Sequence, residues 1–231
     1  SIFLKDQGFT GTEIGLSLMA GSTLSIFFVP YFSNNRLVKH YLIYFLQFLL
    51  LFSCGMALAL KITNSKIITA LTISLFVLSN AFIEPLIGAL FIRLSGKNKK
   101  LGFGSIRNWG SVGWSFSAII AGIIITKTGY LAIFYILITA FLVTIILLLK
   151  FIDFSNDKTV NHAGIKRFRE LFKHKDLVVV SIVFFVEHII GGMTQQFEGI
   201  YLLQLGGTAV LIGAISSLTA LLEIPFMVLA D

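Results

Sequence analysis

The sequence has little cysteine, proline or charge for its length. Of its 231 residues, one is Cys, three are Pro and 13% are charged. A single cysteine, Cys54 within an apolar stretch, excludes a disulfide framework and a thiolate metal site. A metal-ligand cluster, a nucleophile motif and a phosphate-binding glycine loop after a strand are also missing from the sequence. We therefore expect no enzyme activity, no catalytic residue, no metal and no cofactor.

Long apolar stretches make up most of the chain instead. The composition is 56% apolar, and the mean hydropathy is +0.92. An α-helix needs about 20 apolar residues to cross a bilayer, and seven stretches reach that length. We place them at 12–32, 41–60, 67–92, 106–126, 130–151, 177–203 and 209–230. This pattern predicts an all-α membrane protein.

Positive charge is concentrated on one side of the predicted membrane. If successive connectors alternate sides, only Lys5, Lys61, Lys66 and Lys127 fall on one side, and the other 14 of the 18 Lys and Arg residues fall on the opposite side. Because the more basic side is normally cytoplasmic, the long connector 152–176 is predicted in the cytoplasm and residues 1–11 outside. The net charge of +7 thus reflects membrane orientation rather than a nucleic-acid partner. We expect a multi-pass protein of the plasma membrane, the inner membrane in a bacterium.

Residues 8–26 and 206–224 are two copies of one segment. At a constant offset they share Gly8/Gly206, Thr10/Thr208, Ile14/Ile212, Gly15/Gly213, Leu24/Leu222 and Ile26/Ile224. A repeat at the same place in the topology is typical of transporters built from two similar halves. If residues 1–4 end an earlier span, the cytoplasmic connector divides a six-plus-six plan.

This plan predicts three regions: an N-terminal membrane half at 1–151, a central loop at 152–176 and the start of a C-terminal half at 177–231. The chain then begins near the end of a first span and stops before the second half is complete. We expect such a piece not to transport by itself, and the complete protein to be a monomer.

Ionisable side chains within spans usually face a cavity or a partner, because burying a charge in lipid is costly. Glu84 lies directly before Pro85, and Glu223 lies two residues before Pro225. A proline within a span bends the helix and frees a backbone carbonyl. Both are candidates for proton binding, and the alternative is a structural carboxyl bonded to a neighbouring helix.

A third candidate carboxylate, Glu187, lies on a polar stripe of the span 177–203. Helical periodicity places Gly191, Thr194, Glu198 and Tyr201 on the same line, which suits a water-lined pathway. Glu198 lies near the outer interface, where simple solvation is the alternative. His188 points about 100° away from Glu187 and is better interpreted as a packed or hydrogen-bonded histidine than as a proton relay.

The most specific local pattern lies in the span 106–126. Arg107, Ser111 and Trp114 share one helical face, while small residues (Gly110, Gly113, Ser117 and Ala118) allow another helix to approach. A guanidinium offers several donors to hydroxyls or a carboxylate, and an indole offers a flat face to a sugar or aromatic ring. The alternative is an arginine at the membrane surface and a tryptophan packed inside.

The topology resembles that of the major facilitator superfamily. The sequence from Phe103 to Trp114 is similar to the oligosaccharide:proton symporter (lactose permease-like) branch, as is Gln195-Gln196-Phe197. Ile212-Gly213 and Glu223-Ile224-Pro225 are more similar to the 3-phenylpropionate and nucleoside transporter branch. The resemblance implies a major facilitator-type bundle in which Arg107 and Trp114 contact a sugar, with Gln195 and Gln196 as additional donors.

Three carboxylate positions of the symporter branch are occupied here by Ala89, Thr194 and Ala220, so lactose-type specificity does not carry over. We expect a transporter of a small polar, sugar-like solute, coupled to protons through Glu84, Glu187 or Glu223. A nucleoside or aromatic-acid transporter is the alternative within the superfamily. A seven-span receptor is the alternative from another class, although the repeat argues against it, and the absence of lysine in 177–231 disfavours a retinal protein.

Overall fold

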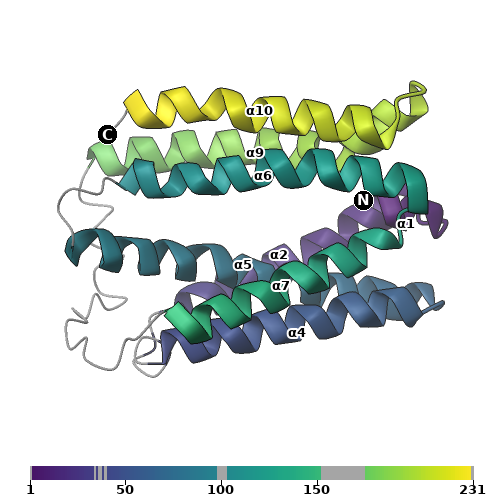
Figure 1. Cartoon of the computed structure of the whole chain (residues 1–231). Coiled ribbons are helices and arrows are strands. Elements are labelled where there is room, and N and C mark those ends of the chain that lie inside the picture. Colours follow the sequence, from purple (N-terminus) through teal and green to yellow (C-terminus); the bar gives the residue numbers. More distant parts are fainter. Residues whose placement is uncertain are drawn as a thin grey trace.

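The chain folds into α-helices that run side by side (Figure 1). The computed structural model describes residues 2–33, 35, 38, 41–97, 103–151 and 175–229. Its helices are α1 (Ile2–Asp6), α2 (Gly11–Ser33), α4 (Leu42–Ile62), α5 (Lys66–Lys97), α6 (Phe103–Thr128), α7 (Ala132–Phe151), α9 (Lys175–Gln204) and α10 (Ala209–Leu229). No strand occurs within these described residues, and the predicted all-α class is confirmed.

Seven of the described helices are long and apolar enough to cross a membrane. The candidate spans are Gly11–Ser33, Leu42–Ile62, Lys66–Leu90, Arg107–Thr128, Ala132–Lys150, Val178–Gln204 and Ala209–Phe226. Each coincides with one predicted stretch, so the apolar runs alone located every span. The predicted central loop 152–176 lies outside the described residues except for Lys175 and Asp176.

The helices form two groups (Figure 1): α6 lies with α9 and α10, and α2, α4, α5 and α7 lie together. Two apolar clusters hold the second group. One contains Leu46, Leu49, Phe82, Leu86 and Leu148 among its buried side chains. The other lies where α1 joins α2 and includes Leu4, Phe9, Ile14 and Phe134. The second group is therefore packed around interlocking aliphatic and aromatic side chains.

The two copies of the repeat have the same turn geometry. Gly8 and Gly206 both have positive φ, 75° and 85°, a conformation that glycine adopts without a steric penalty. Gly8 N donates to the Lys5 carbonyl and Gly206 N to the Leu203 carbonyl, each at 3.0 Å. Phe9 N donates to the Leu4 carbonyl, as Gly207 N does to that of Leu202. Both copies thus end a helix with a Schellman motif.

The helix that follows each turn also begins in the same way. The hydroxyl of Thr10 accepts from Glu13 N at 3.3 Å, and that of Thr208 accepts from Leu211 N at 3.2 Å. A side-chain oxygen at this position satisfies one of the free N–H groups of the first helical turn. Since the offset of 198 holds for every bond, the sequence repeat is also a structural repeat.

Candidate functional site

The site residues on α6 are positioned by close packing against α10. A Cβ added to Gly213 of α10 would overlap the carbonyl oxygen of Ala118 on α6. A Cβ added to Gly122 of α6 would lie 2.6 Å from the carbonyl oxygen of Ala209. Glycine at both positions lets the two backbones approach, which is how small residues join helices in membranes.

Hydroxyl groups continue this contact along the two antiparallel helices. The hydroxyls of Ser115 and Ser217 share a buried hydrogen bond of 2.6 Å. Further along, the Ser111 hydroxyl donates to Oε2 of Glu223 at 3.4 Å. Ser111 is one turn from Arg107 and one turn from Trp114, so Glu223 is brought to the predicted substrate-binding face of α6. That contact could not be read from either helix alone.

Arg107 and Trp114 are both exposed on α6. The Trp114 indole is 64% exposed, although Ser111 between them is buried against α10. An indole can stack on a ring, a guanidinium offers donors and a carboxylate offers an acceptor. The structure thus leaves Arg107 and Trp114 accessible and does not place Trp114 in the packed interior.

Asn108 is a polar residue of this region that the sequence analysis missed. Its side chain is 8% exposed, and its Oδ1 atom accepts no hydrogen bond from a described residue. Asn108, Ser111 and Ser115 follow one another at helical spacing, a polar stripe that the sequence does contain. That stripe was the available signal, and its residues Ser111 and Ser115 are hydrogen-bonded to Glu223 and Ser217 of α10.

The predicted residues Glu187, His188 and Thr194 form contacts along their own helix, α9. Nδ1 of His188 lies 2.7 Å from Oε2 of Glu187, and both side chains are exposed. Gln195 is exposed as well, and the Thr194 hydroxyl donates to the Ile190 carbonyl at 3.0 Å. The side chain of Gln196 lies outside the described part of the chain. His188 is thus hydrogen-bonded and not packed.

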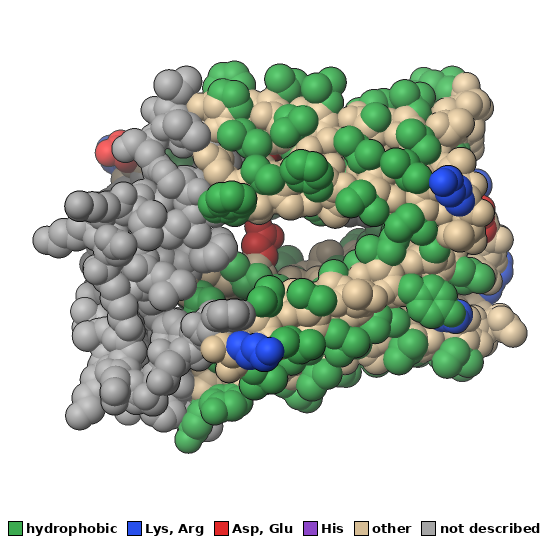
Figure 2. Space-filling view, viewed as in Figure 1, with side chains coloured by type: hydrophobic (Ala, Val, Ile, Leu, Met, Phe, Trp, Pro, Cys, Tyr) green, Lys and Arg blue, Asp and Glu red, His purple; other side chains and the backbone are tan. Residues whose placement is uncertain are grey.

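Glu84 is exposed on α5, immediately before Pro85. The Asn80 amide one turn earlier donates to the Phe76 carbonyl of its own helix, at 2.8 Å, rather than to Glu84. Figure 2 shows a hollow between the two helix groups with an acidic side chain inside it.

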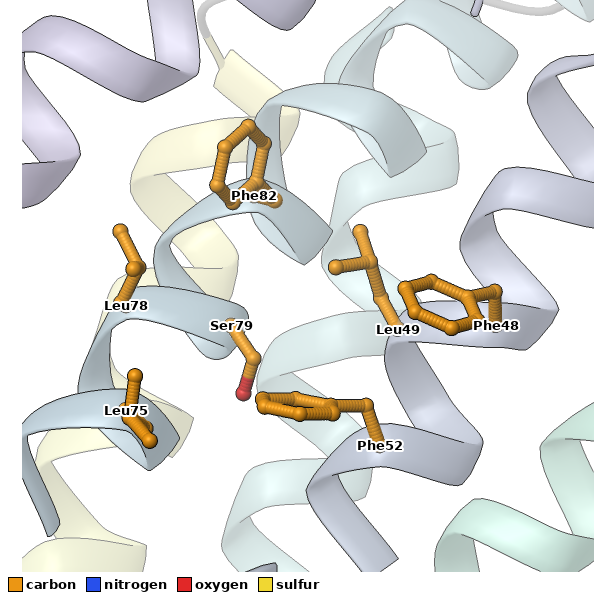
Figure 3. A pocket seen from close by; sticks show the side chains of 7 residues that line it. All are labelled: Phe48, Leu49, Phe52, Leu75, Leu78, Ser79 and Phe82. Atoms are coloured by element: carbon orange, nitrogen blue, oxygen red, sulfur yellow. The ribbon is translucent and has the colours of Figure 1, made fainter. Parts of the chain in front are cut away.

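One described pocket is apolar and differs in chemistry from these sites. It lies between α4 and α5, has a volume of about 140 Å³ and is lined by Phe48, Leu49, Phe52, Leu75, Leu78, Ser79 and Phe82 (Figure 3). The one hydroxyl in that lining, on Ser79, is hydrogen-bonded to the Ser53 hydroxyl at 2.8 Å. The pocket therefore offers no free polar group to a sugar or a proton.

The family comparison agrees with the helical architecture and the repeat. The model of the MFS_1 like family matches residues 1–231, the whole chain. The chain belongs to this family. No curated protein and no solved structure matches it. Together with the seven apolar helices, the match makes this protein a multi-pass membrane transporter of the major facilitator type.

Proposed function

We propose that this transporter moves a small polyhydroxylated solute together with a proton, by alternating access of its two halves around a site in the middle of the membrane. The observation that carries the proposal is the arrangement on α6 and α10. There, exposed Arg107 and Trp114 flank Ser111, whose hydroxyl contacts the Glu223 carboxylate. This set combines substrate recognition with a proton-binding group.

In this proposal Arg107 donates to substrate hydroxyls and Trp114 stacks on the ring, with Gln195 and Gln196 as further donors. Glu223, Glu84 and Glu187 are the proton-coupling candidates, and Glu223 is tested first because it lies beside the substrate-binding face. Substrate, proton and bilayer are the partners, and the protein acts as a monomer. It lies in the plasma membrane with 152–176 on the cytoplasmic side.

A direct test records external pH in weakly buffered, de-energised cells that express the protein. Sugars, nucleosides and aromatic acids are added in turn. We expect alkalinisation with a sugar, lost in Trp114→Ala and retained in Trp109→Ala. Trp109 is a matched control, since it is 76% exposed on another face of α6. Alkalinisation with an aromatic acid alone would instead favour the alternative within the superfamily.

The proton-coupling assignment is tested by Glu223→Gln, which keeps an acceptor for Ser111 but removes the titratable group. We expect this variant to equilibrate labelled sugar across the membrane without alkalinisation. Glu84→Gln and Glu187→Gln are measured in parallel. If alkalinisation survives in Glu223→Gln and is lost in one of the others, the coupling carboxylate is that other residue.

A further inference from the structure

Gly191 is the middle residue of the 27-residue span Val178–Gln204 on α9. Two polar side chains border it from opposite directions along the helix. A Cβ added to Gly191 would lie 4.0 Å from Oε1 of Glu187 and 3.9 Å from Nε2 of Gln195. Because glycine has no side chain, the space between a carboxylate oxygen and an amide nitrogen stays open.

The carboxylate on one side of this space is paired with the next residue along the helix. Oε2 of Glu187 is paired with Nδ1 of His188 at 2.7 Å, which leaves Oε1 turned toward Gly191. Both side chains are more than half exposed, at 67% for Glu187 and 73% for His188. Ionisable groups at the centre of a span face a water-filled cavity or the interior of the bundle rather than lipid.

We propose that Glu187, Gly191 and Gln195 form a cradle for one hydroxyl group of the substrate. The proposal rests on the transport function proposed above and gives its substrate class a structural reason. A hydroxyl can donate to Oε1 of Glu187 and accept from the Gln195 amide at the same time. An ammonium group of a ligand has only N–H donors and could not accept from the Gln195 amide. A carboxylate group of a ligand would be repelled by Glu187. His188 is a positioning residue that orients the carboxylate.

The cradle makes Gly191 the residue that determines specificity. A methyl group at this position would fill the space where the hydroxyl sits, while alanine is also the better helix former. Gly191→Ala therefore removes the cradle without weakening α9. Hydrogen bonds to charged groups contribute enough that their loss raises KM about 10-fold or more.

The chain offers a matched control in the adjacent glycine. A Cβ on Gly192 would meet nothing within 4 Å, so Gly192→Ala changes helix propensity equally and leaves the cradle open. The experiment measures KM for uptake of labelled glucose, sucrose and raffinose in cells, with membrane amounts of each variant matched by immunoblot. We expect KM for the transported sugar to rise at least 10-fold in Gly191→Ala and to stay unchanged in Gly192→Ala.

Deoxy analogues of the transported sugar identify the hydroxyl. The analogue that lacks the bound hydroxyl should have a higher KM than the parent sugar in the wild type. Gly191→Ala should not raise the KM of that analogue further. Gln195→Leu should behave like Gly191→Ala, because it removes the amide donor.

If the wild type takes up a sugar and the two glycine variants have equal KM, the cradle is wrong and the proposed function stands. If the wild type takes up only uncharged or anionic solutes without hydroxyls, both the cradle and the sugar-like class fail, but transport remains. If no labelled solute of any class enters, the proposed function fails and the cradle fails with it.

Discussion

The turn before α2 and the turn before α10 make the same backbone hydrogen bonds, yet the helices that follow pack through different glycines. In the second copy Gly213 meets the Ala118 carbonyl of α6. Its counterpart Gly15 has nothing within 4 Å of a Cβ position. In the first copy the close approach is at Gly21, where a Cβ would overlap the Ser74 carbonyl of α5, and the counterpart of Gly21 is Thr219.

The two copies of the repeat share their turns but not the contacts of the helices that follow. The turns depend on residues within one helical turn of each other, and these are shared between the copies. The packing positions depend on a second helix, and α5 and α6 present different surfaces. Ser74 of α5 donates to the Ser17 carbonyl of α2 at 2.8 Å, whereas α6 and α10 are joined by the Ser115–Ser217 hydroxyl pair.

One of the two largest effects is expected for Gly213→Ala, because the new methyl would lie 2.4 Å from the carbonyl oxygen and 3.1 Å from the carbonyl carbon of Ala118. Backbone cannot rotate away, so we expect a loss of about 3 kcal/mol in the free energy of unfolding. The loss would appear as a lower Tm in detergent. Gly15→Ala, the equivalent change in the first copy, should leave Tm equal or slightly raised. Equal losses in the two variants would contradict the difference in packing.

An effect of the same size is expected for Gly21→Ala in the first copy. The methyl would meet the Ser74 carbonyl and lie 2.9 Å from Cβ of Val77, so α2 must shift from α5 at a cost of about 3 kcal/mol. Thr219→Ala at the equivalent place in α10 should be near neutral, since its exposed hydroxyl bonds only the Ile215 carbonyl of its own helix. Thermal unfolding of both variants decides between these outcomes.

The two turn glycines should behave alike. Gly8→Ala and Gly206→Ala both force a side chain into positive φ, which costs about 1–2 kcal/mol each. Asparagine tolerates this conformation better, so Gly8→Asn and Gly206→Asn should recover part of the loss. A loss of stability at only one of the two glycines would show that the two turns do not contribute equally to the stability of the protein.

The smallest effects are expected at the helix N-caps. Thr208→Ala removes one bond to the Leu211 N–H and should cost about 1 kcal/mol or less. Thr10→Ala should open its helix end more, because it also removes the bond from the Thr10 hydroxyl to the Glu13 carboxylate at 3.0 Å, although the backbone N–H of residue 10 keeps its bond to that carboxylate. Hydrogen exchange at the first-turn amides of α2 and α10 measures both. Faster exchange at α10 than at α2 would reverse this order.

Much of the membrane architecture was predictable because it depends on composition over short windows. The predicted stretch 41–60 corresponds to α4 at Leu42–Ile62, and 67–92 to the span within α5. Helix α5 continues to Lys97 beyond the apolar stretch, since helical hydrogen bonding does not stop where hydrophobicity does. The repeat was also visible, because glycine and threonine are required by its turn geometry.

Less of the candidate site was predictable. Periodicity placed Arg107 and Trp114 on one face of α6, but the Ser111–Glu223 contact joins residues 112 positions apart. The Glu187–His188 pair was missed because a 100° separation of side-chain directions still lets two long neighbouring side chains meet. The roles of these residues in substrate binding and proton coupling remain predictions to be tested by transport.

The sequence by itself determined the number and bounds of the described spans, the repeat and the chemistry of its turns. These properties follow from the cost of exposing apolar or backbone groups, which neighbouring residues settle locally. Only the tertiary structure decided that α10 packs on α6, that Gly213 and not Gly15 is the contact, and that Ser111 meets Glu223. In a bilayer such choices depend on how closely two distant helix surfaces fit, because lipid provides no hydrophobic drive between them.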